Sequence, residues 1–431
     1  MRSFFTFIIV AIALSVSAQT DSVFSVSSNI FSWFDPTQLH LSDSGKVSVH
    51  FGTEFLVGSS SQPVSFTDKL LFGGYIDDEE KDNVSKRLKD LNYGGVDFES
   101  DFYISFKTDS LCKNSAIFFG GSYNYFQSLA YTRDFFNIAF YGNKLYEGDT
   151  ATFSNSAFSG YSLIEYKAGF VKQFSVKKGN LILGIAGGFV QGLSANQANI
   201  HQGILATAPG GEYLDITMDF EYNNSGNEPV SFDNTKGTGY SFDVFTKFQN
   251  KEKRFEIIAG IQDMGMMYWN NTPNNYIADT SYIFDGIDIT YVFNASGTNS
   301  DGGNDSIFDI LGIDTTNLPF RTATPAKLNV SFTQYFSSSN LFINAGAQYY
   351  LFTPYQIYLY GRFGKNFINQ SLQISGIVNV GGFGGFGIGV DIEKKISNSV
   401  FLRVGSNSIL GFIAPNTFNT ASVFGTIKKT F

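Results

Sequence analysis

The chain has 431 residues, of which 43% are hydrophobic, 17% aromatic and only 16% charged, and its net charge of -9 excludes nucleic acid as an expected partner. After residue 18 no apolar run reaches the length of a transmembrane helix, so a helical membrane protein is excluded. Cys112 is the single cysteine, so no internal disulfide can form.

The first expected element is a signal peptide at residues 1–18. Arg2 precedes an apolar run over residues 4–16, which is too short for a bilayer span of about 20 residues. Ser17 and Ala18 close this run, and small residues at that place are typical of a cleavage site. We therefore expect cleavage after Ala18 and export of a mature domain of residues 19–431.

Alternation of apolar and polar residues dominates the rest of the chain. In the first run, Val47, Val49 and Phe51 share one face and Ser48 and His50 the other, as in a β-strand. Similar runs begin near residues 97, 116, 161, 180, 213, 239, 254, 327, 341, 355, 371, 385, 400 and 421. One of these runs is expected to lie outside the wall of the fold, so the pattern predicts an all-β fold of about 14 wall strands (roughly 12 to 16), an even number.

The number and length of the runs distinguish a membrane barrel from a soluble β-sandwich, which also alternates. The runs are about 9 to 11 residues long, enough for a tilted strand to cross a bilayer, whereas globular strands average about 5 to 6. A chain exported from a Gram-negative cell can bury such faces in lipid only if the sheet closes. The sequence therefore predicts a transmembrane antiparallel β-barrel in the outer membrane.

Three stretches break the alternation and are expected to lie outside the wall or inside the lumen. Residues 76–91 and 131–143 have apolar residues at helical spacing, and residues 294–320 are expected to form a polar loop followed by a short helix.

The polar faces of the strands are expected to line the lumen. Opposite charges attract strongly at low dielectric, and a barrel of about 14 strands is narrow enough to be filled by side chains and inward segments. We therefore expect a plugged barrel, and the aromatic side chains of Tyr358 and Tyr360 also favour a filled interior. The candidate lumen-lining residues are Glu54, Glu99, Asp243, Glu256, Arg362, Asp391 and Arg403.

Asp263 interrupts an apolar face that includes Ile257 and Ile261. A carboxylate facing lipid is costly, so the strand is expected to end or to form a bulge there. Tyr268 and Trp269 follow, as in an aromatic girdle at the membrane interface. The three residues Asp263, Tyr268 and Trp269 are thus a candidate interface or rim site.

The chain ends on Phe431, inside a run whose apolar face includes Val423 and Ile427. A last strand that closes the barrel against the first cannot fray. A terminal aromatic residue resembles the signal that the barrel-assembly machinery reads, although Lys429 stands where a hydrophobic residue is usual. We therefore expect Phe431 to be part of an assembly signal.

Several motifs in this order resemble an uncharacterised family of Bacteroidota outer-membrane β-barrels of the DUF5723 type, similar to PorP/SprF and fatty-acid-transporter-like barrels. They are "LLFGGYIDDEEK", "FYGNKLYEGDT", "GIQDMGMMYWNN" with "YIFDGIDI", "LPFRTATPAKLNVSF" and "RVGSNSILGFIAPNT". The resemblance runs from about residue 20 to the end and implies a barrel in outer-membrane lipid, without a known reaction.

No motif predicts catalysis or a cofactor. The glycine-rich residues 381–387 lack the Lys-Ser or Lys-Thr of a phosphate loop, and residues 300–309 match no EF-hand spacing, so calcium is the lesser alternative there. His40, His50 and His201 are scattered, without a metal-binding pattern.

Two functional classes therefore remain. The protein would bind or transport a small, hydrophobic solute, or it would anchor surface or periplasmic partners, as in type IX secretion or gliding. An enzyme is not expected.

Overall fold

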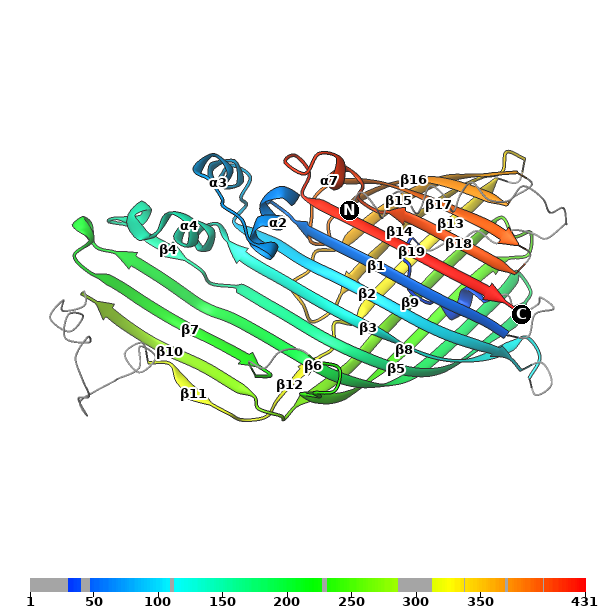
Figure 1. Ribbon diagram of the computed structural model, residues 1–431, viewed down its shortest axis with the longest axis horizontal. Coiled ribbons are helices and arrows are strands. Elements are labelled where there is room, and N and C mark those ends of the chain that lie inside the picture. Colours follow the sequence, from blue (N-terminus) through cyan, green and yellow to red (C-terminus); the bar gives the residue numbers. More distant parts are fainter. Residues whose placement is uncertain are drawn as a thin grey trace.

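Antiparallel strands close into a barrel in this computed structural model (Figure 1). The structure describes residues 30–39, 47–108, 112–226, 231–285, 312–336, 338–368, 371–397 and 399–431. The predicted signal peptide, His40 and the loop at 300–309 lie outside these residues. The ring closes where β1 (Val47–Ser59) pairs with β19 (Thr420–Thr430), from Ser48 opposite Thr430 to Gly58 opposite Thr420.

Fourteen strands of the described chain form the ring, which confirms the predicted fold and strand number. Between β1 and β19 the wall strands are β2 (Leu91–Lys107), β3 (Ser115–Thr132), β5 (Ser156–Val176), β6 (Gly179–Thr207), β8 (Gly237–Asn250), β9 (Phe255–Trp269), β13 (Lys327–Phe336), β14 (Leu341–Tyr350), β15 (Tyr358–Phe367), β16 (Leu372–Val380), β17 (Gly387–Ser397) and β18 (Val400–Ser406).

The two ends of the barrel differ. At the end that carries the C-terminus, neighbouring strands are joined by short turns, for example residues 177–178 between β5 and β6. The opposite end, called the loop end below, carries long connections with the helices α2 (Val64–Phe72), α3 (Asp78–Ser85), α4 (Arg133–Tyr141) and α7 (Leu410–Ile413), and the 3-10 helix η2 (Asn143–Tyr146). Short turns at one end and long loops at the other are the usual form of outer-membrane barrels.

The predicted helices at 76–91 and 131–143 are present, but the first is shorter than predicted. Asp77 and Glu80 form a capping box that starts α3, and the helix ends at Ser85. The hydroxyl of Thr132 accepts a hydrogen bond from the amide of Phe135 and starts α4.

Beyond the loop end, the sheet continues on one side of the barrel. The second half of β6 leaves β8 and pairs with β7 (Leu214–Asn224), which pairs with β10 (Asn274–Phe284). This extension, seen at the left of Figure 1, contains the one predicted run that is not a wall strand. Two short strands flank this extension, β4 (Thr150–Thr152) beside β6 and β11 (Asp314–Thr316) beside β10. A third, β12 (Phe320–Ala323), pairs with β9 of the wall. The 3-10 helix η3 (Pro209–Gly211) lies between β6 and β7.

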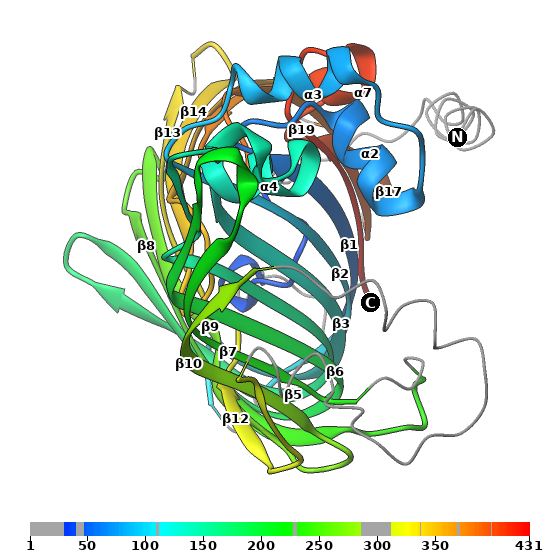
Figure 2. The same cartoon turned by 90° about the vertical axis from the view of Figure 1, so that its left-hand side faces the viewer.

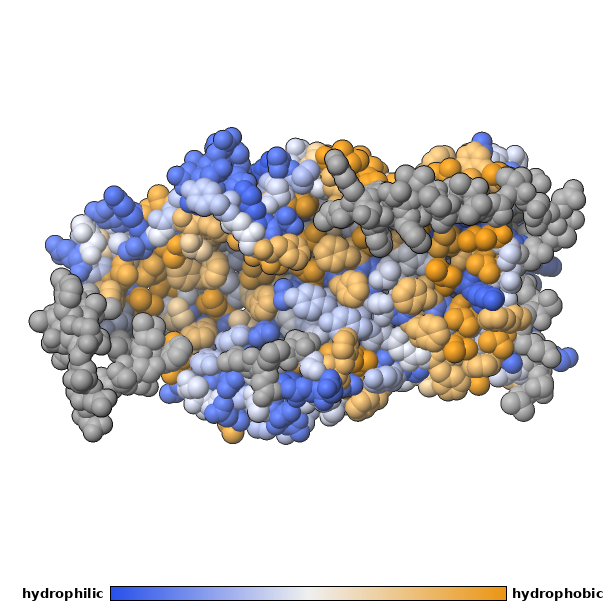
Figure 3. Space-filling view, viewed as in Figure 1, coloured by the Kyte–Doolittle hydropathy of each residue, from blue (hydrophilic) through white to orange (hydrophobic). Residues whose placement is uncertain are grey.

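The outer face of the barrel is apolar. Its exposed side chains include Phe51, Phe102, Val330, Phe332 and Ile388, and Figure 3 shows such residues gathered over the strands near the C-terminal end. Among the described residues no helix is long and apolar enough to cross a membrane. The exposed apolar face and the closed ring make this a transmembrane barrel, because lipid tolerates neither polar faces nor unpaired strand edges.

The N-terminal segment, residues 30–39, lies inside the barrel (Figure 2). It contains the 3-10 helix η1 (Pro36–Gln38), and nearly all its residues are buried. Asp35 caps this helix, since its carboxylate accepts hydrogen bonds from the amide and the hydroxyl of Thr37. The wall therefore surrounds an ordered piece of its own chain.

Candidate functional site in the barrel interior

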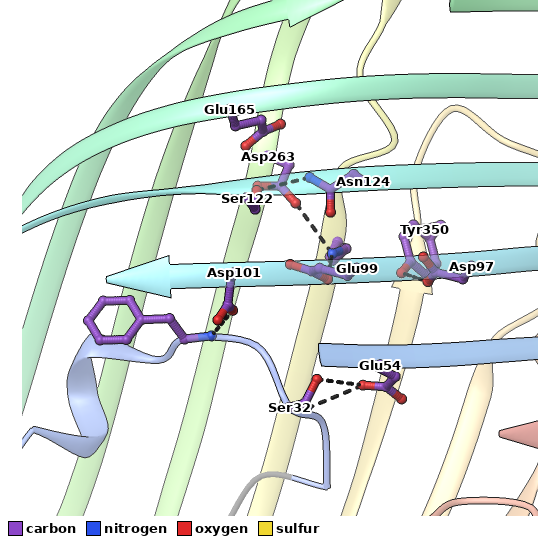
Figure 4. A network of polar contacts seen from close by, with 12 residues as sticks. Ser32, Glu54, Asp97, Glu99, Asp101, Ser122, Asn124, Glu165, Asp263 and Tyr350 are labelled. Carbon is purple, nitrogen blue, oxygen red and sulfur yellow. Dashed lines mark hydrogen bonds and ion pairs between the residues drawn. The ribbon is translucent and has the colours of Figure 1, made fainter. Parts of the chain in front are cut away.

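The N-terminal segment is bound to the wall by its backbone. The amide of Phe34 donates to Asp101 Oδ2 at 2.7 Å, and the amide of Ser32 donates to Glu54 Oε2 at 3.2 Å (Figure 4). Gly52 lies opposite Asp101 on the neighbouring strand and two residues before Glu54 on β1. A Cβ at Gly52 would be 2.4 Å from the Ser32 carbonyl oxygen. Glycine at this position therefore lets the segment touch β1.

The segment also contacts strands near the C-terminus, where Thr426 of β19 pairs with Gly52 of β1. Thr426 Oγ1 donates to the carbonyl oxygen of Ser32 at 3.3 Å, and Lys428 Nζ donates to that of Gln38 at 3.1 Å. Arg403 Nη1 donates to the carbonyl oxygen of Phe31 at 3.4 Å. Within the described residues the segment joins no β-ladder of the wall, so side chains hold it in place.

An acidic network fills the middle of the interior. Lys167 Nζ lies 2.8 Å from Glu165 Oε2 and 3.0 Å from Asp243 Oδ2, and it also contacts Asp263. Lys327 binds Glu99 and lies 3.6 Å from Asp263 Oδ2. Asp97 accepts a hydrogen bond from the Tyr350 hydroxyl in the same region (Figure 4). Carboxylates outnumber lysines here, so removing either lysine would leave buried negative charges unpaired.

A second, more basic network lies on β15, β17 and β18. Arg362 makes a two-pronged contact with Asp391, with Nε–Oδ2 and Nη2–Oδ1 distances of 2.9 and 2.6 Å. Arg403 Nε lies 3.3 Å from the same Oδ1 atom. All three side chains are buried, and paired guanidinium–carboxylate contacts of this kind fix side-chain orientation.

The structure places every candidate lumen-lining residue inside the ring, but not in one site. Glu99 and Asp243 join the acidic network, and Arg362, Asp391 and Arg403 form the basic one. Glu54 binds the N-terminal segment, and Asn407 Nδ2 donates to its other oxygen. Glu256 is 2.9 Å from Lys247 Nζ and accepts a hydrogen bond from the Tyr335 hydroxyl.

Asp263 lies at a bulge, as the sequence predicted, and β9 continues past it. Its φ angle is +59°, and the register between β8 and β9 shifts between Phe242 and Val244. The bulge turns the carboxylate into the interior, where the Asp263 amide donates to Asp243 Oδ1 at 2.7 Å. The expected rim position of Asp263 is therefore wrong, because two buried lysines hold its side chain inside.

The same bulge reverses the faces of the residues that follow. Tyr268 is on the outer face, where the Arg321 guanidinium stacks over its ring at 5.7 Å. Trp269 points inward and is completely buried, so its expected place in an interfacial girdle is wrong. Its Nε1 donates to Thr322 Oγ1 at 2.9 Å, and its ring lies where a Cβ on Gly192 would be.

An aromatic cluster closes the interior on the loop side of the networks. Tyr350 is the last residue of β14, and Tyr355 and Phe383 come from the connections after β14 and β16. All three pack with Phe31 and Trp33 of the N-terminal segment. Tyr358 and Tyr360 are buried in the same cluster. The glycine-rich residues 381–387 serve this packing, since Gly381 and Gly382 have positive φ angles in the turn that brings Phe383 inward.

Three cavities lined by described residues are small. One of about 100 Å³ lies beside the N-terminal segment and is lined by Phe31, Trp33, Phe34 and Phe401 together with polar groups such as His50. Two others, of about 20 and 10 Å³, are close to the size of single water molecules. In the described part of the chain no group of His, Cys, Asp and Glu side chains has the arrangement of a metal site.

A model of a "family of unknown function (DUF5723)" matches residues 41–402. The chain belongs to this DUF5723 family. No curated protein sequence matches this DUF5723 member.

Solved structures resemble this DUF5723 barrel only distantly. A TodX deltaS2S3 mutant, a monoaromatic hydrocarbon channel, is 8% identical, with a TM-score of 0.45 over 90% of this chain and 91% of that chain. The P. putida toluene transporter TodX is 8% identical, with a TM-score of 0.42 over 92% of each chain. A Pseudomonas aeruginosa FadL homologue is 7% identical, with a TM-score of 0.39 over 91% of each chain.

Proposed function

We propose that the protein is an outer-membrane barrel, closed at rest by its N-terminal segment, that binds and passes a small hydrophobic solute. The observation that carries this proposal is the way the segment is held. Backbone groups of Ser32 and Phe34 bind side chains of the wall, and the described segment takes no part in the strand ladder. It can therefore leave the lumen without breaking the barrel.

The cavity beside the segment supports a hydrophobic solute. Its aromatic side chains, Phe31, Trp33, Phe34 and Phe401, offer flat apolar surfaces, and ligand pockets in proteins are mostly apolar with a few polar groups. A solute that takes the place of these rings against the wall would favour release of the segment, because it binds the open state better than the closed state.

Heavy-atom quenching tests this proposal. Bromobenzene is titrated into a Trp269→Phe variant in lipid nanodiscs, so that Trp33 is the only tryptophan. The control variant carries Trp33→Phe, Trp269→Phe and Phe332→Trp. Its single tryptophan is on the outer face, so its quenching measures bromobenzene dissolved in the surrounding lipid. We expect saturable quenching of Trp33 and a linear response of the control. Linear responses from both would contradict solute binding.

Membrane insertion belongs to the same proposal. We propose that the signal at residues 1–18 directs export and that the barrel-assembly machinery reads Phe431, which is 62% exposed beside the closing seam. The Phe431 amide donates to the carbonyl oxygen of Val47, so the residue also continues the pairing of β19 with β1. Deleting Phe431 should leave export intact and leave uninserted protein in the periplasm. Normal amounts of folded barrel in the outer membrane would refute this role.

A scaffold for surface or periplasmic partners is the second candidate. The sheet extension of β6, β7 and β10 supports it, because these strands reach past the wall and expose Ile277 and Ile283. A photo-crosslinking residue at position 283, compared with one at lipid-facing position 332, tests this role in native membranes. A protein adduct at 283 alone would favour the scaffold, and lack of any adduct would count against it.

A further inference from the structure

Helix α2 and the turn after it expose a continuous apolar surface at the loop end. The exposed fractions are 47% for Leu70, 42% for Leu71, 76% for Phe72 and 84% for Tyr75. We call these four residues the exposed apolar turn. Runs of consecutive exposed apolar residues are unfavourable in water and need a partner.

The start of α2 packs on the lipid-facing side of the wall. Val64 contacts a cluster formed by outward-facing residues of four strands, in which Val57, Val96 and Ala421 are buried and Phe55 and Tyr125 are half-buried. The helix therefore covers the outer face of β1, β2 and β19, and not the mouth of the barrel. Figure 2 shows α2 outside the ring of strands.

The height of this cluster coincides with the edge of the hydrocarbon layer. Val49 and Val57 face outward on β1, eight residues apart, which is about 26 Å along a strand at roughly 3.3 Å per residue. A strand tilt of about 40° reduces this to about 20 Å along the membrane normal, and the apolar band of such barrels is about 25 Å tall. A band of this height that includes Val49 near its turn-side edge therefore has its loop-side edge close to Val57, where the helix leaves the wall.

Charged groups lie on the other side of α2. Lys69 Nζ binds Glu80 of α3 at 2.5 Å, which ties the two helices together. The N-cap residue Asp77 and the first two residues of α3, Asp78 and Glu79, are exposed. The two helices therefore present an apolar turn and an acidic face, as expected for an element that lies at a membrane interface with its polar side in water.

We propose that the exposed apolar turn inserts into the lipid leaflet at the loop end and anchors α2 in the membrane interface. Lipid is the expected occupant because α2 begins on the lipid-facing surface, where Val64 packs beside Phe55 of β1, and its exposed apolar residues follow within three turns of helix. A soluble protein would have to displace lipid to reach a patch at this height. The inference rests on the transmembrane barrel and is independent of solute transport.

Site-directed spin labelling of the full-length barrel in phosphatidylcholine nanodiscs tests this proposal. Nitroxides are attached to Leu71→Cys, Phe72→Cys and Tyr75→Cys in a Cys112→Ser background, one at a time. Collision with oxygen, which concentrates in lipid, is compared with collision with a water-soluble nickel chelate. Phe51→Cys is the lipid-facing control, and Glu79→Cys on α3 is the water-exposed control.

We expect the ratio of oxygen to nickel collisions at positions 71 and 72 to be several-fold higher than at 79 and close to the ratio at 51. Position 75 should give an intermediate ratio, since tyrosine favours the headgroup level. Because three positions are labelled one at a time, the result does not depend on any single label that disturbs folding. Ratios at 71 and 72 equal to that at 79 would overturn the proposal and would leave the turn as a surface for a protein partner.

Discussion

The backbone amide of Phe34 donates a 2.7 Å hydrogen bond to Oδ2 of Asp101, so β2 holds the N-terminal segment from the inside of the barrel. The other carboxylate oxygen, Oδ1, lies 3.1 Å from His50 Nε2. The Phe34 ring also stacks on Tyr103, with centroids 4.4 Å apart. The buried carboxylate of Asp101 thus holds the backbone of Phe34, while the neighbouring Tyr103 holds the Phe34 ring.

Asp101→Ala should loosen the segment. Hydrogen bonds to charged groups contribute about 1.5–3 kcal/mol, so we expect the detached state to become at least about tenfold more populated. The measurement is the rate at which a water-soluble maleimide labels Ser32→Cys in a Cys112→Ser background. Ser32 is 2% exposed, so labelling requires detachment.

Asp97→Ala is the matched control for this variant. Asp97 is on the same face of β2, but it accepts a hydrogen bond from Tyr350 and none from the segment among the described contacts. We expect little change in the labelling rate of Ser32→Cys. Equal acceleration by both variants would mean that general loosening of the barrel, and not the Phe34 contact, exposes the segment.

Gly52→Val should displace the segment by steric contact. A Cβ at Gly52 would lie 2.4 Å from the backbone oxygen of Ser32, and neither backbone can yield at low cost. Gly376→Val is the control, because a Cβ there meets no described atom within 4 Å. Limited proteolysis of the segment in folded barrels should be faster for Gly52→Val only. Full protection in both variants would contradict the close approach of the segment to β1.

Lys167→Met should destabilise the barrel by about 3–5 kcal/mol, because it leaves the buried carboxylates of Glu165, Asp243 and Asp263 without a shared cation. Urea unfolding in lipid vesicles, followed by tryptophan fluorescence, measures the loss. Adding Asp243→Asn should restore part of the stability. An unchanged unfolding midpoint in Lys167→Met would show that the acidic network does not carry charge in the folded barrel.

Val330→Arg should cost about 2–4 kcal/mol in a bilayer, since Val330 is on the outer face near the middle of β13. Gln334→Arg, on the same face of the same strand but nearer the turn end, should cost about 0–1 kcal/mol. The free energy of unfolding in lipid vesicles gives both values. Equal costs would contradict a lipid band centred on the middle of the wall.

The strands could be predicted from the sequence because the alternation of apolar and polar residues can be read within each strand alone, without knowing which strands pair. All wall strands lie near predicted runs, and the bulge at Asp263 follows from the cost of a carboxylate in lipid. The inward direction of the Trp269 side chain could not be predicted. The bulge shifts the alternation by one residue, so residues after it that were expected to face outward face inward.

The interior was only partly predictable for a different reason. Alternation places Glu99 or Asp243 on the inner face, but the partner of each charge depends on which strands meet across the lumen. Lys167 and Lys327 were therefore missed as the centres of the acidic network. The N-terminal segment has no strand period, and the aromatic run Phe31, Trp33 and Phe34 was the one signal that it packs against something.

The conductance of the purified protein in planar bilayers tests most directly whether the N-terminal segment closes the barrel. The unmodified protein should show little steady current, because the segment occupies the interior and packs against wall side chains in two buried clusters. A variant lacking residues 30–39 should show frequent openings under the same voltage. Stable, large, ohmic openings in the unmodified protein would contradict the account and identify an open diffusion pore.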